Sequence, residues 1–382
     1  MIYADYNATT PLSDGAKTWM NQALELWGNP SSSHKHGRKA LELLNKAREV
    51  VAALLEVHPN EVVFTSGGSE ANTLALMGSA LEVGKDFRLL TSGVEHSSVK
   101  DTVTVIEKLG GTAQYIPVDQ DGQISLAVLE EKLQTFQPHL VSLMTANNET
   151  GVIFPIPEIL ELCHQYQCRL HTDAVQGLGK LNPSFYRHAD LVSVSAHKIY
   201  GPKGIGALII KKGTPLVATH YGGSQEIKRR GGTENVIGIV GFGGAAAELK
   251  NHSPVPSIAE VRDHFESYLG QNLDGMSIQG LKAPRIPNTS NIRFHGIASE
   301  VLLGALDLDG ISISAGSACS SGSISPSHVL LSMGLSEKEA KECVRFSWGR
   351  SSNLGLVEEV AQKVMDHVNR IRARNRAKEV LK

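Results

Sequence analysis

The sequence has few cysteines, few aromatic residues and no excess of charge of either sign. Its 382 residues include four cysteines, too few for the disulfide framework of a small secreted domain. Lysine and arginine total 37 against 39 acidic residues, so the net charge of -2 gives no broad field for nucleic acid or a membrane surface. No direct nucleic-acid binding is therefore expected.

Long apolar runs are also missing. None approaches the ~18 residues of a membrane-spanning helix, and the N-terminal segment MIYADYNATTP lacks the basic, apolar leader of a secretory signal. Cys163 and Cys168 have no paired His or Cys motif, so we interpret them as packing thiols and expect no metal site. We predict a cytoplasmic protein with reduced thiols and no membrane association.

The length fits one large domain plus a smaller one. A polar, proline-bearing break at 251–256 predicts a large domain over 14–252 and a small domain formed by 1–13 and 253–382. Strands and helices alternate from 61 to 210, which predicts the α/β class, with a mostly parallel central sheet flanked by helices. Helix, strand and helix patterns in the last third predict a smaller α+β domain.

Lys198 lies where an apolar strand, 191–196, gives way to a loop. The turn at 201–204 (GPKG) precedes the next apolar run, 205–210. Ligands bind at such strand ends in open α/β sheets. A lysine amine walled in by apolar strands has its pKa lowered by desolvation, which suits a Schiff-base nucleophile near neutral pH. Taken alone, an ordinary loop lysine with a solvated head is the commoner explanation.

Other polar features follow the predicted strands. The turn 66–69 (SGGS) leads directly into a helix and can bind a phosphate through free N–H groups and the helix dipole. His96 follows the strand 88–91, and an imidazole there can stack on a planar ring or move protons. Asp173 ends the strand 168–173 and needs a cationic partner if it lies away from water. A tight connection and a structural histidine remain the alternatives at the first two.

Together these strand-end features match the needs of pyridoxal 5'-phosphate (PLP). Lys198 would bond the aldehyde, and the 66–69 turn would bind the phosphate. Asp173 would keep the pyridine nitrogen protonated, so that the ring acts as an electron sink. The combination makes a mere loop lysine a poor explanation for Lys198.

Two features of the last third add to this site. The segment 314–323 (SAGSACSSGS) has almost no bulky side chain except the thiol of Cys319, so we expect a mobile loop, about 315–326, with an exposed thiol. A harmless free cysteine is the alternative. Arg345, in the short strand 344–347, could grip a carboxylate with two N–H groups.

The chain resembles a known family along nearly its whole length: the cysteine desulfurases of the NifS/IscS type, in the class V aminotransferase group of fold-type I PLP enzymes. The matching motifs, in the family's order and spacing, are NATTP, NPSSSH, FTSGGSEAN, EHSSV, NNETG, DAVQG, SAHKIYGPKGIGAL, RGGTEN, GSACSSG and VRFSWGR. Small departures, such as Ser69 where many relatives have Thr, remove no catalytic group.

The resemblance implies a role for each matched residue. Lys198, His96 and Cys319 would be catalytic, as the cofactor-bonding lysine, the acid/base stacked on the ring and the nucleophile. The implied cofactor-binding set is Lys198, Asp173, Gln176, Asn148, His96, Gly68, Ser69, Ser195, His197 and Thr233. Thr233 would come from the other subunit of a homodimer, and Arg345 and Asn148 would bind the substrate carboxylate.

The implied reaction removes sulfur from L-cysteine, giving L-alanine and a Cys319 persulfide for a sulfur-acceptor protein, either an iron–sulfur scaffold or a sulfur carrier. A PLP-dependent cysteine/cystine C–S lyase and a selenocysteine lyase remain alternatives, because they use the same cofactor without the loop thiol. A non-catalytic sulfur-transfer partner is disfavoured by the intact Lys198, Asp173 and His96. A nucleotide-binding protein is disfavoured because no complete nucleotide fingerprint is present.

Overall fold

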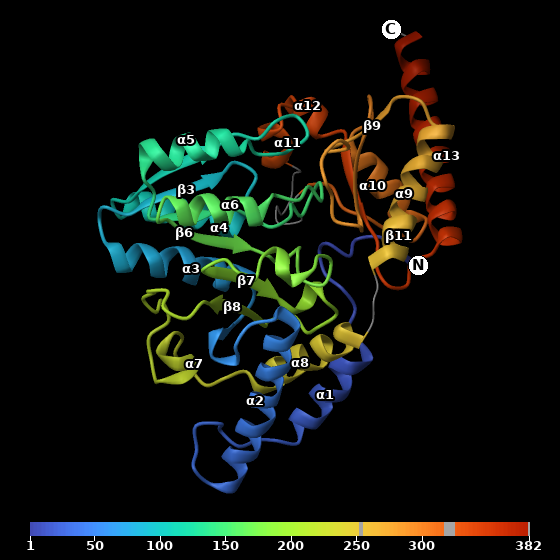
Figure 1. The fold of residues 1–382 in the computed structure, drawn as a ribbon. Helices are drawn as coiled ribbons and strands as arrows, with labels where there is room; N and C mark the ends of the chain where they lie inside the picture. The colour runs from blue at the N-terminus through green and yellow to red at the C-terminus, as the bar shows by residue number, and fades with distance from the viewer. Residues whose placement is uncertain (252–254, 317–324, 381–382) are drawn as a thin grey trace.

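The computed structural model describes residues 1–251, 255–316 and 325–380, in which a large sheet and a smaller C-terminal part lie side by side (Figure 1). The large sheet has seven strands in the order β2-β8-β7-β6-β5-β3-β4. These strands are β2 (Val62–Thr65), β3 (Arg88–Ser92), β4 (Thr112–Ile116), β5 (Leu140–Ser142), β6 (Arg169–Asp173), β7 (Leu191–Ser195) and β8 (Gly206–Ile210). All seven lie within the stretch 61–210, where the sequence predicts alternating strands and helices.

The sheet is mostly parallel, as expected, with one strand reversed. β8 runs antiparallel to both β7 and β2, whereas the pairs among β3, β4, β5, β6 and β7 are all parallel. The reversal has a simple cause: a parallel crossover needs a dozen residues or more, and β7 and β8 are joined by the shorter stretch 196–205. This short connection carries Lys198.

Helices cover the sheet. They are α1 (Asp14–Leu24), α2 (Lys35–Leu55), α3 (Gly68–Val83), α4 (Ser97–Lys108), α5 (Leu126–Phe136), α6 (Ile156–Gln165), the short α7 (Gln225–Lys228) and α8 (Val236–Asn251). α3 packs against β7 and β8, and it buries Ala71, Leu74 and Ala75. His34 caps the start of α2, because its Nδ1 accepts the N–H of Gly37 at 3.2 Å.

The C-terminal part has a hydrophobic core of its own. Its elements are α9 (Val255–Asn272), β9 (Met276–Ile278), β10 (Thr289–Phe294), α10 (Ser299–Leu308), β11 (Ile311–Ser312), α11 (His328–Ser332), α12 (Glu337–Ala340), β12 (Cys343–Ser347) and α13 (Leu354–Val380). β12, β10 and β9 form an antiparallel sheet, and α9 packs against α13. Phe265, Phe346 and Trp348 pack ring to ring in this core.

The C-terminal core is separate from the hydrophobic clusters around the large sheet, which fits the predicted pair of domains, and the boundaries at 13/14 and 252/253 stay a prediction. α11 departs from a simple division, because its Val329 and Leu330 pack against the core of the large sheet. Among the described residues, no helix is long and apolar enough to span a membrane.

An N-terminal arm joins the two cores. β1 (Ile2–Tyr3) pairs in parallel with β11, and Ser347 in β12 donates its N–H to the carbonyl of Ala4 at 2.8 Å. Farther along, Thr10 N donates to the carbonyl of His197 at 3.0 Å. Residues 4–10 are therefore held between the small sheet and the turn that carries Lys198.

Candidate functional site

A cavity of about 300 Å³ lies at the ends of β6 and β7, where these strands meet the N-terminal arm. Apart from Thr233 and Cys319, every predicted site residue lines it. The lining residues are Asn7, Ala8, Gly68, Ser69, Asn72, His96, Ser98, Met144, Ala146, Asn148, Asp173, Val175, Gln176, Ser195, His197, Lys198 and Arg345. Side chains from β6, β7, β12, α3 and the arm thus meet in one place.

Lys198 enters the cavity from a short 3₁₀ turn, Ala196–Lys198, that directly follows β7. Its Nζ donates to the main-chain oxygens of Asn7 at 2.6 Å and Ala8 at 2.8 Å. The sequence predicted apolar walls around this amine, and the structure instead places two carbonyl groups of the arm against it. The arm motif was recognised in the sequence without a role, because nothing local pairs residues 7 and 198.

Asp173 ends β6 and is almost fully buried. Its Oδ2 accepts from Nδ2 of Asn72 at 2.7 Å, and its Oδ1 accepts the N–H of Val175 at 3.0 Å. These two partners are neutral amides. A positively charged group in the cavity would therefore stabilise this buried carboxylate. Asn72, on the first turn of α3, was missed as a site residue.

The N-terminal end of α3 is the predicted phosphate cradle, and its geometry is compatible with that prediction. The helix begins at Gly68 with no side chain capping it, so the N–H groups of its first turn are available to an anion. Ser195 adds a hydroxyl whose oxygen is buried and without a hydrogen-bond partner in the described structure. A Cβ on Gly68 would lie 2.7 Å from Val175 Cγ2, which leaves little room for a larger residue. Buried, unsatisfied donors around such a helix end fit a phosphate group.

His197 lies beside this cradle as a neutral imidazole. Burial, with the positive charges of Lys198, Lys203 and Lys180, lowers its pKa to about 4. Its Nδ1 lies 3.2 Å from the hydroxyl oxygen of Thr9. His197 can therefore hydrogen-bond an anion but contributes no positive charge at neutral pH.

His96 caps the start of α4. Its Nδ1 accepts the N–H of Ser98 at 3.2 Å and lies 2.9 Å from the Ser98 hydroxyl. Because Nδ1 acts as an acceptor, the neutral ring carries its proton on Nε2. The same hydroxyl accepts from Nδ2 of Asn72 at 2.9 Å, so the residue that holds Asp173 also braces His96 through Ser98.

Gln176 is held through both ends of its amide. Nε2 donates to the Asn7 carbonyl at 3.0 Å, and Oε1 accepts from the Lys180 amine. Burial and the nearby cations Lys198 and Arg345 lower the pKa of Lys180 well below its ordinary value. Lys180 was missed in the sequence, because its spacing from Gln176 marks nothing by itself.

Arg345 reaches the cavity from β12. Its Nη1 donates to the main-chain oxygen of Asn148 at 2.9 Å, and its Nη2 donates to Asp5 Oδ1 at 2.7 Å. Its Nε is buried without a partner in the described structure. Asp5 was not predicted, and it is the acidic residue of the arm.

The two remaining predicted residues lie elsewhere. Thr233 is exposed and is not among the residues that line the cavity. Its predicted position in the cavity of a partner subunit stays a prediction. Cys319 lies outside the described residues.

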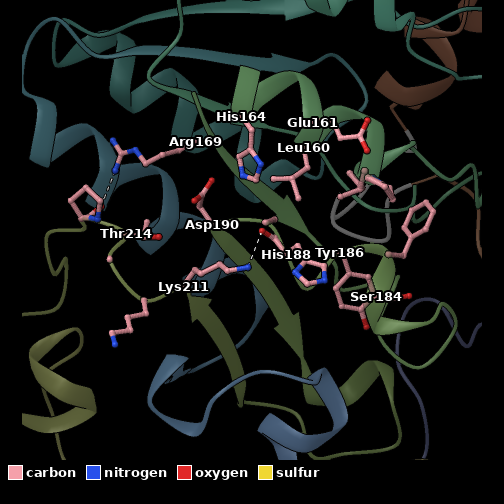
Figure 2. Close-up of a pocket in the computed structure, with 17 residues that line it drawn as sticks. Leu160, Glu161, His164, Arg169, Ser184, Tyr186, His188, Asp190, Lys211 and Thr214 are labelled. Carbon is pink, nitrogen blue, oxygen red and sulfur yellow. Dashed lines mark hydrogen bonds between the residues drawn. The ribbon is translucent and has the colours of Figure 1, made fainter. Parts of the chain in front are cut away.

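A larger hollow of about 750 Å³ lies at the opposite ends of the strands, near the start of β6 and the end of β8 (Figure 2). Several of its charged groups are engaged with the protein: Arg169 pairs with Glu82 at 3.1 Å, and Asp190 accepts the N–H of Leu170 at 2.8 Å. Lys211 Nζ points to the carbonyl of His188 at 3.4 Å. The smaller cavity is therefore the better candidate site.

Comparison with known proteins places this cavity in a family. The family model for class-V aminotransferases matches residues 2–360. The cysteine desulfurase IscS of Dictyoglomus turgidum is 38% identical in an alignment of 378 residues that covers 97% of this chain and 96% of that protein. A cysteine desulfurase of a Nostoc species is 39% identical, over 98% of this chain and 94% of that protein.

Solved structures agree with these relatives. A structure titled as a NifS-like protein superposes with a TM-score of 0.87 at 33% identity, covering 96% of this chain and 99% of that one. A structure titled as SspA in complex with cysteine gives a TM-score of 0.81 at 34% identity, covering 92% and 99%. They confirm the fold class predicted from the sequence. The chain belongs to the class-V aminotransferase family and, within it, to the cysteine desulfurases of the NifS/IscS type.

Proposed function

We propose that this protein is a PLP-dependent cysteine desulfurase, which takes the sulfur of L-cysteine and releases L-alanine. The proposal is supported best by one observation: Lys198, Asp173 and the unpartnered hydroxyl of Ser195 border a single cavity. A PLP molecule needs an amine for its aldehyde, a carboxylate for its ring nitrogen and donors for its phosphate. The chemistry of these residues fits that cofactor.

Each of these residues would contact a different part of the cofactor. Lys198 would bond the aldehyde, and Asp173 would supply the negative charge that keeps the ring nitrogen protonated. The phosphate would be bound by Gly68, Ser69, Ser195 and His197, with Thr233 of a partner subunit completing the cradle. Gln176 and Asn148 would contact the ring's side, and His96 would cover its face. When bound, PLP draws electrons from the amino acid and thereby weakens bonds at its α and β carbons.

Lys198 and His96 would move the protons. The Lys198 amine lies beside two carbonyl acceptors, so it is oriented when it takes a proton from the amino acid. Nε2 of His96 carries an exchangeable proton in the neutral ring, because Nδ1 is engaged with Ser98. Arg345 would bind the α-carboxylate of the substrate, with Asn148 beside it.

Cys319 would be the nucleophile. Its thiolate attacks the sulfur of the substrate, an S–S bond forms, and the bond between that sulfur and the β carbon breaks. The electron pair stays with the three-carbon fragment, which takes a proton and leaves as L-alanine. No outside oxidant is needed, and the persulfide sulfur passes to an acceptor protein. The relatives' name IscS favours iron–sulfur cluster assembly as the pathway served.

Mass spectrometry of the protein after L-cysteine treatment tests the proposal. We expect a one-sulfur adduct on Cys319, lost in Cys319→Ser and kept in the control Cys343→Ser. Cys343 is a good control because its thiol is buried and donates to the carbonyl of Glu339, a contact that serine can replace. Wild-type sulfide release by Cys319→Ser would favour a C–S lyase or a selenocysteine lyase instead. Failure of borohydride to fix a pyridoxyl group on Lys198 would refute PLP binding.

A further inference from the structure

Arg345 already has a carboxylate partner from the protein. Its Nη2 and Asp5 Oδ1 are 2.7 Å apart, and the side chains are 3% and 17% exposed, respectively. Nη1 is taken up by the Asn148 carbonyl, so two acceptors from different parts of the chain fix the plane of the guanidinium. These bonds use two of the five N–H donors of the guanidinium, and Nε has no partner among the described residues, so donors remain for a further acceptor.

Asp5 cannot easily leave this position, because backbone hydrogen bonds hold the residues on both sides of it. Ala4 N donates to the carbonyl of Ser312 at 2.9 Å, and Tyr6 N donates to the carbonyl of Ser347 at 3.2 Å. Arg345 is equally fixed: its N–H and carbonyl both pair with Ser314, at 2.7 and 3.2 Å. The ion pair therefore joins two rigid segments.

An α-carboxylate arriving at Arg345 must therefore share the guanidinium with Asp5. The two carboxylates would then lie near each other beside a guanidinium that is 3% exposed, where like charges repel more strongly than in bulk solvent. A fixed acceptor also orients the guanidinium before the substrate arrives, which lowers the entropy cost of binding.

We propose that Asp5 is a positioning residue that sets how tightly the site holds the carboxylate of its amino acid. It orients the guanidinium of Arg345. As a second carboxylate on the same cation, it also lowers the affinity for the carboxylate of the product, so that the product can dissociate. This inference rests on the proposed function for the role of Arg345.

Asp5→Asn separates the two effects, because the amide oxygen can still accept from Nη2 while the negative charge is lost. Calorimetric titration of the cofactor-loaded protein with L-alanine and with L-alaninamide, which lacks the carboxylate, measures how much the carboxylate contributes to binding affinity. We expect L-alanine to bind about tenfold more tightly to Asp5→Asn, with L-alaninamide unchanged within about twofold. KM for L-cysteine falls in parallel, and kcat falls as L-alanine is retained.

Asp5→Ser, which also removes the orienting acceptor, should lose that gain and bind L-alanine no better than the wild type. If Asp5→Asn folds poorly, Asp5→Gln, which also keeps an amide acceptor and removes the charge, takes its place. The matched control is Glu342→Gln, which breaks another ion pair of the small sheet, with Arg293 Nε at 2.7 Å. Its ratio of L-alanine to L-alaninamide affinity should stay that of the wild type.

An unchanged ratio in Asp5→Asn, or an equal change for both ligands in that variant, would overturn the role of Asp5. Failure of the proposed function gives a different result: no adduct on Cys319 and no sulfide from L-cysteine in the wild type. If the wild type forms no adduct and no sulfide but still binds L-alanine through Arg345, the ratio of L-alanine to L-alaninamide affinity still tests the role of Asp5. Loss of L-alanine binding in Arg345→Ala identifies that case.

Discussion

Lys198 donates its Nζ proton to the main-chain oxygen of Asn7 at 2.6 Å, although the two residues are 191 positions apart. The arm is as much a part of the site as the strand ends are. The Asn7 side chain holds it there: Nδ2 donates to Thr289 Oγ1 at 2.8 Å, and Oδ1 accepts from Asn288 Nδ2 at 3.0 Å.

Asn7→Ala should therefore affect both stability and the cofactor. It leaves buried polar partners unsatisfied, which costs about 1–3 kcal/mol of unfolding free energy, and it loosens the carbonyl that faces Lys198. We expect a lower urea midpoint and a weaker affinity for PLP. Asn353→Ala, which removes only a bond to Leu356 N at the start of α13, is the control and should leave PLP affinity unchanged. Equal PLP affinity in both variants would contradict the role of the arm.

Ser195→Ala should separate cofactor binding from folding. The Ser195 hydroxyl has no partner in the described structure, so its removal breaks no protein hydrogen bond. A hydrogen bond to a charged group is worth about 1.5–3 kcal/mol, so we expect a 10- to 100-fold loss of PLP affinity with unchanged stability of the cofactor-free protein. In the control Ser79→Ala, a buried hydroxyl bonded to the Ala75 carbonyl is lost, and stability should fall without a change in PLP affinity.

Asp173→Asn should slow the reaction without preventing cofactor attachment. The neutral amide cannot hold a protonated ring nitrogen, so the electron sink weakens while the amine of Lys198 remains. We expect kcat to fall by roughly 10²–10³, as for the loss of one electrostatic stabiliser, and borohydride still to fix a pyridoxyl group on Lys198. Asp173→Glu keeps the charge and should recover part of the rate. Wild-type kcat in Asp173→Asn would exclude this role.

Local patterns predicted the strand ends well and the links between them poorly. Asp173 and Lys198 follow apolar strands, so their meeting at one edge of a parallel sheet follows from topology. The reversed β8 also follows from its short connection. Asn7, Asp5 and Lys180 had no such signal, because each acts through a contact that depends on tertiary packing. Lys198 contacts a main-chain oxygen, which every residue type carries, so the sequence gives no sign of this contact.

Glu95, next to His96 in the chain, makes stability depend on pH. Its side chain is fully buried, and burial raises its pKa from the ordinary 4.5 to about 8, although Ser92 and the N–H of Met144 hydrogen-bond to it. Between these two pKa values the folded protein holds a proton that the unfolded chain has lost, so unfolding releases that proton. The contribution of Glu95 to stability is therefore greatest below pH 4.5, falls as pH rises, and levels off above about pH 8.

Glu95→Gln removes this dependence, because the amide is neutral at every pH. We expect the unfolding free energy of the variant, relative to the wild type, to rise by roughly 4 kcal/mol from about pH 5 to about pH 8. Urea unfolding of the cofactor-free proteins across this range measures it. His171, whose pKa burial lowers to about 3, adds the opposite slope below its ordinary 6.5, and it cancels in the difference because both proteins contain it. Parallel curves for the two proteins would mean that Glu95 is already ionised in the folded state at neutral pH.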